Sequence, residues 1–441
     1  MSESTGDLTG SREQQPELRG GAGTVRAGER WPSRSFRWLW AASATSLLGS
    51  EIGELALPLL ALLTLDASAG ELAVVRVAQY APFLVLTLAL GVMVDRMRRK
   101  RLLIAADLAR GVVLTAIVIA ALALPLPIWM LAVAVFVIGT CTVLAQLADF
   151  SLLPAVVPND RLTDANARLT STQSAMSIAG SGVGGVIVQT LTAPIALAAN
   201  AATYLFSALF LTRVTAVERA RNEAVDRVSP WLEARAGLAF LRRNRVVRDL
   251  ALEAATWNFA SEILLLGLTL HVTQQYDLGP AILGGLLMTS GAGAVLGALV
   301  SARATRRFGY GRSLIAASIV GNSAPLALIF TAAAPSAAAL AVAGVALALS
   351  GFGVGLAGAQ AVTVRQLATP DDIRGRVNAA YRFLSWGMIA IGAIAAGFVA
   401  TAGGPAVAIV VGAVGTTLAT GWILWSPVRK LRGLDDAVEA R

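Results

Sequence analysis

Long apolar stretches recur along the chain between Leu39 and Trp425, each close to the length that a helix needs to cross a bilayer. About 20 apolar residues in a helix span roughly 30 Å of hydrocarbon. Short polar or turn-forming segments separate the stretches, such as DASAGE at 66–71 and GGP at 403–405. The pattern predicts twelve membrane-spanning helices, at 38–65, 71–94, 102–124, 128–150, 168–191, 194–213, 249–272, 279–301, 312–333, 336–359, 375–401 and 405–427.

The composition fits a chain whose solvent is lipid. Of the 441 residues, 56% are hydrophobic and only 14% are charged, and the mean hydropathy is +0.67. A soluble protein has a larger polar shell, with about a quarter of its residues charged. The sequence therefore predicts an all-α membrane protein with twelve transmembrane helices.

Positive charge is confined to one side of the predicted spans. If the amino terminus is cytoplasmic, 34 of the 36 Lys and Arg residues fall in the terminal segments, in cytoplasmic loops or at the cytoplasmic ends of spans, and the other two, Arg76 and Arg110, fall deeper within spans. Such a bias sets orientation during insertion, so we expect both termini in the cytoplasm and the protein in the cell membrane. This topology explains the net charge of +9, and no nucleic-acid partner is expected because aromatic residues for base stacking are not interleaved with the basic ones.

Two segments 212 residues apart share a pattern, because PNDRLTDANA at 158–167 and PDDIRGRVNA at 370–379 have Pro, Asp, Asn and Ala at the same spacing. Further matches continue in this register, which predicts a duplicated chain of two six-helix halves. The expected division is a disordered cytoplasmic tail at 1–35, an amino-terminal half at 36–213, a cytoplasmic linker with an amphipathic helix at 214–248, a carboxyl-terminal half at 249–428 and a cytoplasmic tail at 429–441.

The loop after the second span, GVMVDRMRRKRLLI at 91–104, has five basic residues in six positions. Gly91 permits two helices to approach closely, and Asp95 beside the guanidinium groups can form charge-assisted pairs that hold one arrangement of the halves. Anchoring at anionic lipid headgroups explains some of the basic residues equally well. A carboxylate at Asp95 adds nothing to such anchoring.

Twelve spans in two halves with this loop resemble the major facilitator superfamily. DLAR at 107–110, LLPAVVP at 152–158 and RGRVNA at 374–379 are similar to the branch that contains enterobactin exporters and macrolide or multidrug efflux proteins. The resemblance covers about residues 36–428 and implies a conformational latch in the basic loop. The latch residues that it implies are Gly91, Asp95, Arg96, Arg99 and Lys100, with Asp149 as a candidate partner.

A glycine-rich segment in the fifth span, AGSGVGGV at 179–186, occupies the place of a motif that antiporters of this superfamily carry. Ser181 stands where a proline is common in that motif, which weakens the implication of export. Close helix packing alone also explains the glycines.

Some carboxylates fall within predicted spans, where a charge costs about 2.5–3.5 kcal/mol at the bilayer centre and marks a functional pathway by default. Glu51 and Glu54 lie three residues apart on one face of the first span, so they can share or exchange protons. Glu262 lies at the corresponding depth of the seventh span, beside Trp257 and Asn258. We predict that these five residues form the proton and substrate sites, with the carboxylate and the aromatic face holding a cationic or amphipathic molecule.

A structural role is the alternative for the charges inside the spans. Glu54 can pair with Arg76, and Asp107 can pair with Arg110, as buried ion pairs that only stabilise the fold.

The sequence has no set of residues for catalysis. His271 is the single histidine, no Ser/His/Asp set or phosphate-binding loop is present, and neither a metal nor another cofactor is expected. We therefore predict a non-enzymatic, monomeric secondary transporter that exports an amphipathic small molecule by alternating access in exchange for protons, with membrane lipids around it. The alternatives are proton-coupled uptake, and a solute sensor or lipid translocator that uses the same fold.

Overall fold

The computed structural model describes residues 31–431 apart from 124, 159–160, 216–229, 277, 332–335 and 371–372, and every element in this part of the chain is helical. The helices are α1 (Arg34–Leu63), α2 (Ala69–Val85), α3 (Thr87–Arg96), α4 (Arg99–Ala123), α5 (Ile128–Val156), α6 (Leu162–Thr190), α7 (Ala193–Thr212), α8 (Pro230–Arg243), α9 (Arg245–Leu270), the π-helical η2 (His271–Gln275), α10 (Pro280–Phe308), α11 (Tyr310–Ser323), the 3₁₀-helical η3 (Ala324–Leu326), α12 (Ala327–Thr331), α13 (Ala337–Leu367), α14 (Arg374–Leu424) and the 3₁₀-helical η4 (Pro427–Lys430).

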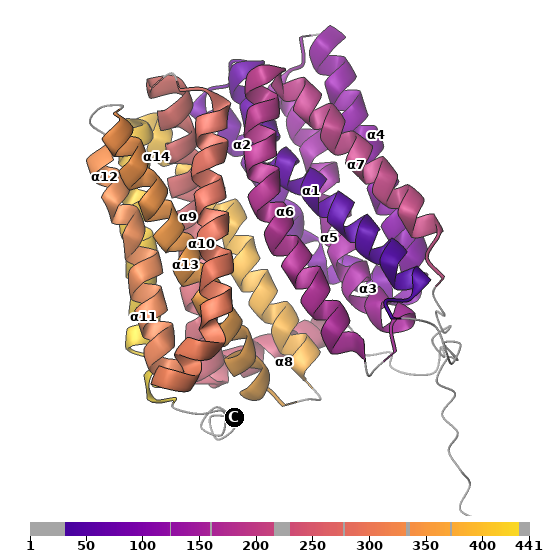
Figure 1. Cartoon of the computed structure of the whole chain (residues 1–441), viewed down its shortest axis with the longest axis vertical. Helices are drawn as coiled ribbons and strands as arrows, with labels where there is room; N and C mark the ends of the chain where they lie inside the picture. Colours follow the sequence, from indigo (N-terminus) through magenta and orange to yellow (C-terminus); the bar gives the residue numbers. More distant parts are fainter. Residues whose placement is uncertain are drawn as a thin grey trace, which may run out of the picture.

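The helices form two bundles that stand side by side, with α1 to α7 in one and α9 to α14 in the other (Figure 1). Within the first bundle α1 packs on α6 and α7, and within the second α9 packs on α14 and α10 packs on α13. Two helix pairs, α2 with α14 and α6 with α10, join the bundles. The predicted all-α transmembrane fold of two halves is confirmed.

Eight helices of the described chain are long and apolar enough to cross a membrane. One of them, α14, has 51 residues and bends at Gly404, where φ is +82°. A residue with a Cβ is strained at positive φ, so glycine is suited to this position. The turn predicted at 403–405 therefore divides α14 into the last two spans.

The helices depart from the predicted spans in two ways. Helix α13 continues to Leu367 and α5 to Val156, past the predicted ends at 359 and 150, because helical hydrogen bonding can continue after the apolar pattern has stopped. The predicted span at 312–333 is interrupted by η3, which contains Pro325. A proline has no backbone N–H and disturbs the regular helix.

Helix α8 lies across one end of the molecule, beneath the first residues of α14 (Figure 1). We call this end of the molecule the linker end. Helix α8 packs on α14, α9 and α3. A Cβ on Gly237 would lie 2.3 Å from the backbone oxygen of Arg376, so the absence of a side chain permits this contact. The predicted amphipathic segment thus includes a helix that contacts both bundles, whereas most of the predicted tails (1–30 and 432–441) lies outside the described residues.

Candidate functional site

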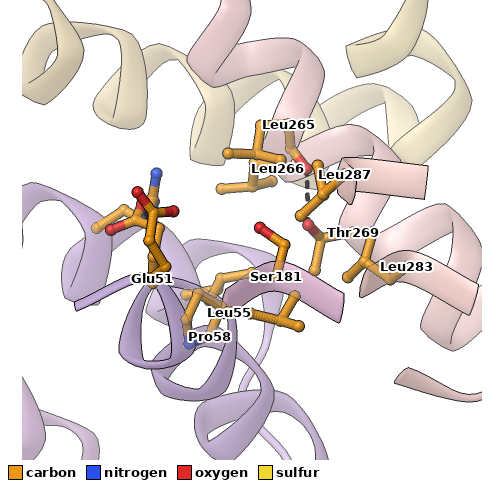
Figure 2. A pocket seen from close by; sticks show the side chains of 12 residues that line it. Glu51, Leu55, Pro58, Ser181, Leu265, Leu266, Thr269, Leu283 and Leu287 are labelled. Atoms are coloured by element: carbon orange, nitrogen blue, oxygen red, sulfur yellow. Dashed lines mark hydrogen bonds and ion pairs between the residues drawn. The ribbon is translucent and has the colours of Figure 1, made fainter. Parts of the chain in front are cut away.

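A small pocket lies between the two bundles, beside the second half of α1 and the last turns of α9 (Figure 2). Its volume is about 50 Å³, which is room for a few water molecules. Most of its wall is apolar, and Glu51, Ser181 and Thr269 bring polar groups to it. The lining residues are Glu51, Glu54, Leu55, Pro58, Leu72, Arg76 and Ser181 from the first bundle, and Leu265, Leu266, Thr269, Leu283 and Leu287 from the second.

Arg76 on α2 joins the two bundles at this pocket. Its Nε lies 2.6 Å from Oε1 of Glu262 and its Nη2 lies 2.8 Å from Oε2 of the same residue, so the pair is bidentate. Its Nη1 donates to Oε1 of Glu54 on α1 at 2.5 Å. Arg76 and Glu262 are each 4% exposed. We call Glu54, Arg76 and Glu262 the Arg76 bridge.

The side chains that follow Arg76 on α2 fix Glu54 in place. The Gln79 amide donates to Oε2 of Glu54 at 2.6 Å, and the Tyr80 hydroxyl donates to Oε1 at 3.0 Å. These donors replace the water that the carboxylate would have outside the membrane. Glu54 is therefore held by α2, while Glu262 is held across the boundary between the bundles.

Because the Arg76 bridge is buried, separating its charged partners costs free energy. Removing one partner of a buried ion pair costs about 3–5 kcal/mol because an unpaired charge stays in a medium of low dielectric constant. Moving α2 away from α9 would leave Glu262 in that condition, whereas Arg76 keeps Glu54 as a partner in its own bundle. Two carboxylates and one guanidinium also leave one excess negative charge, which binding of a proton or a cation would neutralise.

Glu51 lies beside the bridge and in contact with the glycine-rich segment of α6. A Cβ on Gly180 would lie 2.3 Å from the Cβ of Glu51, and Ser177 is a hydrogen-bond partner of the Glu51 carboxylate. No ion pair to Glu51 is present in the described part of the chain. Glu51 is thus the carboxylate of this pocket that Arg76 does not neutralise.

The same glycine-rich segment also lies at the boundary between the bundles. A Cβ on Gly185 would lie 2.9 Å from the oxygen of Pro280 and 3.1 Å from the Cα of Gly284, both on α10. Close packing, the simpler explanation of these glycines, is therefore present on two faces of α6.

Trp257 and Asn258 do not line the pocket. The Asn258 amide donates to the backbone oxygen of Ser385 on α14 at 2.7 Å, and the buried indole N–H of Trp257 has no hydrogen-bond partner among the described residues. The structure brings Glu51, Glu54 and Glu262 together and places these two neighbours of Glu262 elsewhere on α9.

The residues of the predicted latch lie at the linker end. The Lys100 ammonium donates to the backbone oxygens of Thr212 and Val214, at 2.9 and 2.7 Å, and a Cβ on Gly91 would meet open space. Arg99 takes part in an interaction of its own. The side chains of Asp95 and Arg96 lie outside the described residues, so the latch stays a prediction.

Asp149, the candidate partner of the latch, lies near Asp107, whose charge acts on it. The alternative ion pair of Asp107 with Arg110 is present, and the Ser207 hydroxyl donates to Oδ2 of Asp107 at 2.6 Å. The ion pair of Glu54 with Arg76 is present too. Arg76 and Arg110 are thus both paired with carboxylates, as the structural alternative requires, and one of the pairs extends across the two bundles.

Sequence reasoning missed Glu253 on α9. Its carboxylate accepts a hydrogen bond from the Asn322 amide at 3.2 Å, and that amide also donates to the Thr420 hydroxyl at 3.2 Å. The signal that marks Glu253 is its place within the predicted span 249–272, a place that it shares with Glu262.

Comparisons with known proteins agree with this architecture. A family described as transmembrane secretion effector, of the major facilitator type, matches residues 31–440. Macrolide efflux protein A of Streptococcus pyogenes is 30% identical over 231 residues, which are 51% of this chain and 55% of that protein. The protein of the same name from Enterococcus faecalis is 30% identical over 187 residues, 41% of this chain and 56% of that protein. The chain therefore spans about half the length of the curated relatives that it matches.

Solved transporter structures share the fold. The nucleoside transporter NupG superposes with a TM-score of 0.71 at 13% identity, covering 89% of this chain and 98% of that one. A bacterial homologue of the iron transporter ferroportin, in an inward-facing state, has a TM-score of 0.68 at 15% identity with the same coverage. At such low identities the likeness concerns the fold alone. The family match over nearly the whole length places this chain in the transmembrane secretion effectors of the major facilitator superfamily, which are membrane transporters and not enzymes.

Proposed function

We propose that this protein is a secondary active transporter that exports an amphipathic small molecule in exchange for protons. The observation that carries the proposal is the Arg76 bridge, a buried ion pair between the two halves with one negative charge in excess. The curated relatives, which are macrolide efflux proteins, support the direction of transport. The positive charge of the loops supports a cytoplasmic linker end, because Lys and Arg gather on the cytoplasmic side of membrane proteins.

In this proposal the halves rock about the pocket. Contacts between them are close near the end opposite the linker end, where a Cβ on Gly397 of α14 would lie 2.4 Å from the Cβ of Ala73 on α2. The Arg76 bridge and the contacts of Gly185 with α10 hold the halves together on the same side. Opening toward the outside requires that both sets of contacts separate.

Protons are the coupling ions because a proton can neutralise a carboxylate that pairs with Arg76. Binding of a proton neutralises Glu262 or Glu54, which weakens the bidentate pair and lowers the cost of separating α2 from α9. Release of that proton to the cytoplasm restores the carboxylate and the bridge. Glu51, which has no arginine partner among the described residues, is available to hold a cationic or polar group of the substrate.

The test is transport in proteoliposomes with a radiolabelled macrolide and an imposed pH gradient. We expect the macrolide to move against the direction of proton flow, and we expect this movement to stop when an ionophore collapses the gradient. Movement in the same direction as the protons would show uptake by symport. Gradient-independent behaviour with no macrolide movement would favour a sensor or a lipid translocator and would overturn the proposal.

A further inference from the structure

Two arginines on different helices of the second half come together at the linker end. Arg365 lies near the end of α13, and its Cζ is 3.8 Å from the ring centroid of Tyr381 on α14. Arg382 is the next residue on α14, with its Cζ 5.8 Å from the ring centroid of Trp386. The two guanidinium groups are close enough for their charges to repel each other. We call Arg365 and Arg382 the arginine pair.

Neither arginine forms an ion pair with a carboxylate of the described chain, which distinguishes them from Arg76 and Arg110. Glu253 acts electrostatically on Tyr381, but its carboxylate accepts its hydrogen bond from Asn322, at 3.2 Å. Two neighbouring cations without a counter-ion are unfavourable in a partly desolvated place, and an anion that binds both would remove the repulsion.

The arginine pair is held in position by aromatic side chains. The Tyr381 hydroxyl donates to the backbone oxygen of Leu250 on α9 at 3.5 Å, so the ring under Arg365 is fixed between two helices. The Arg365 guanidinium is hydrogen-bonded to Tyr381, and a guanidinium held against a ring still has N–H groups at its edge that can bind a carboxylate or phosphate. The pair is therefore pre-organised for an anionic group.

The arginine pair lies next to the boundary between the halves. Trp386, one helical turn from Arg382, packs against Phe83 of α2 with ring centroids 5.0 Å apart and the ring planes tilted by 39°. Arg382 lies closer to the linker end than this contact. Its side chain is exposed, while Arg365 is half-buried. A molecule that enters between the halves from the linker end would therefore meet Arg382 before it reaches the pocket at the Arg76 bridge.

We propose that the arginine pair binds the anionic group, a phosphate or a carboxylate, of an amphipathic molecule at the entrance between the halves. The proposal deepens the export function and rests on it only for the direction of entry. Two sources share this chemistry, the headgroup of an anionic membrane lipid and a free anionic amphiphile. A general preference for positive charge in cytoplasmic loops does not require that two arginines be stacked and placed together at this boundary.

The experiment measures binding by the purified full-length protein in phosphatidylcholine nanodiscs. The probes are octyl phosphate, which is anionic, and octyltrimethylammonium, which has the same chain and a positive charge. We expect Arg382→Gln to weaken octyl phosphate binding at least tenfold, because a charge-assisted hydrogen bond is lost, and to leave octyltrimethylammonium binding unchanged. Arg365→Gln should act in the same direction, but it also removes a stacking contact, so the exposed Arg382 is the decisive position.

The matched control is Arg303→Gln, since Arg303 is an exposed arginine near the linker end of α10 that forms no ion pair with a described carboxylate. It should leave the binding of both probes unchanged. Equal octyl phosphate affinities for the unaltered protein, Arg382→Gln and Arg365→Gln would overturn the proposal. Equal losses in Arg303→Gln and Arg382→Gln would overturn it as well, because they would show a general effect of surface charge.

Nanodiscs that contain phosphatidylglycerol separate the two sources. A lower affinity for octyl phosphate in these nanodiscs, with phosphatidylglycerol retained by the unaltered protein but not by Arg382→Gln in native mass spectra, identifies the lipid headgroup. An unchanged affinity identifies a free amphiphile, and both results support the site. Intact octyl phosphate binding by a protein that moves no macrolide would count against the export proposal alone.

Discussion

Two buried arginines of the first half have the same chemistry and different positions. Arg76 and Arg110 are each 4% exposed, and each is paired with a carboxylate inside the membrane-spanning region. Arg110 pairs with Asp107 on its own helix α4 and lies 4.2 Å from the ring centroid of Tyr204 on α7, so all its partners belong to one half. Arg76 reaches Glu262 in the other half.

The difference teaches what a buried ion pair does in a protein whose halves move. A pair within one half keeps its partners when the halves rock as rigid bodies, so it stabilises the half and does not oppose the motion. A pair between the halves must break each time that end opens, so its strength contributes to the barrier. We therefore expect changes at Asp107 to lower stability and changes at Glu262 to alter the conformational equilibrium.

The largest effect is expected from Glu262→Gln, compared with Asp107→Asn. Loss of the Glu262 charge removes the buried pair between the halves, so the end opposite the linker end should open more often. Breaking such a pair is worth about 3 kcal/mol or more, which is about a hundredfold in a population. The measurement is the rate at which a membrane-impermeant maleimide, added from outside, labels Ser181→Cys at the pocket in a Cys141→Ser background.

Asp107→Asn is the control for that experiment. It should lower the thermal stability and leave the labelling rate close to that of the parent, because its partners lie in one half. Equal labelling rates in Glu262→Gln and the parent would contradict the role of the bridge.

An intermediate effect is expected at the glycines of α6. A Cβ on Gly185 would press on the backbone of α10 in the other half, whereas a Cβ on Gly180 would press on Glu51 in the same half. Overpacking costs about 1–3 kcal/mol, so Gly185→Ala should increase maleimide labelling of Ser181→Cys by roughly tenfold with little loss of stability. Gly180→Ala should lower the melting temperature instead, and a reversed pattern would show that α6 does not contact α10 as described.

The smallest effect is expected from removing a single hydroxyl. Tyr80 donates to Glu54 at 3.0 Å in the bridge, and Tyr204 lies 3.0 Å from the Ser50 hydroxyl beside Arg110. One hydrogen bond contributes about 1 kcal/mol. Tyr80→Phe should therefore change the rate of macrolide transport a few-fold at a given pH and alter the pH profile of the rate. Tyr204→Phe should lower stability by about the same free energy and keep the pH profile of the parent, and identical profiles for the two variants would remove the distinction between the regions.

The candidate site was predicted only in part. Glu51, Glu54 and Glu262 stand out in the sequence because a carboxylate within an apolar run is rare, and the structure places all three near one pocket. Trp257 and Asn258 were chosen as neighbours of Glu262 in the chain, yet the rotation of α9 keeps them out of the pocket lining. From the sequence, the arginine pair was counted only among the positive charges of the cytoplasmic side, because nothing in a linear pattern shows that two arginines on different helices meet.

The sequence by itself determined that this protein lies in lipid, crosses it repeatedly and consists of two related halves. These properties are encoded locally, since hydrophobicity sets the solvent of each segment and a repeated motif shows duplication. The tertiary structure alone decided that Arg76 pairs with Glu262, a residue 186 positions away, as well as with Glu54. The physical reason is that a pair between helices depends on the depth and rotation of both, and these are set by packing across the two halves together.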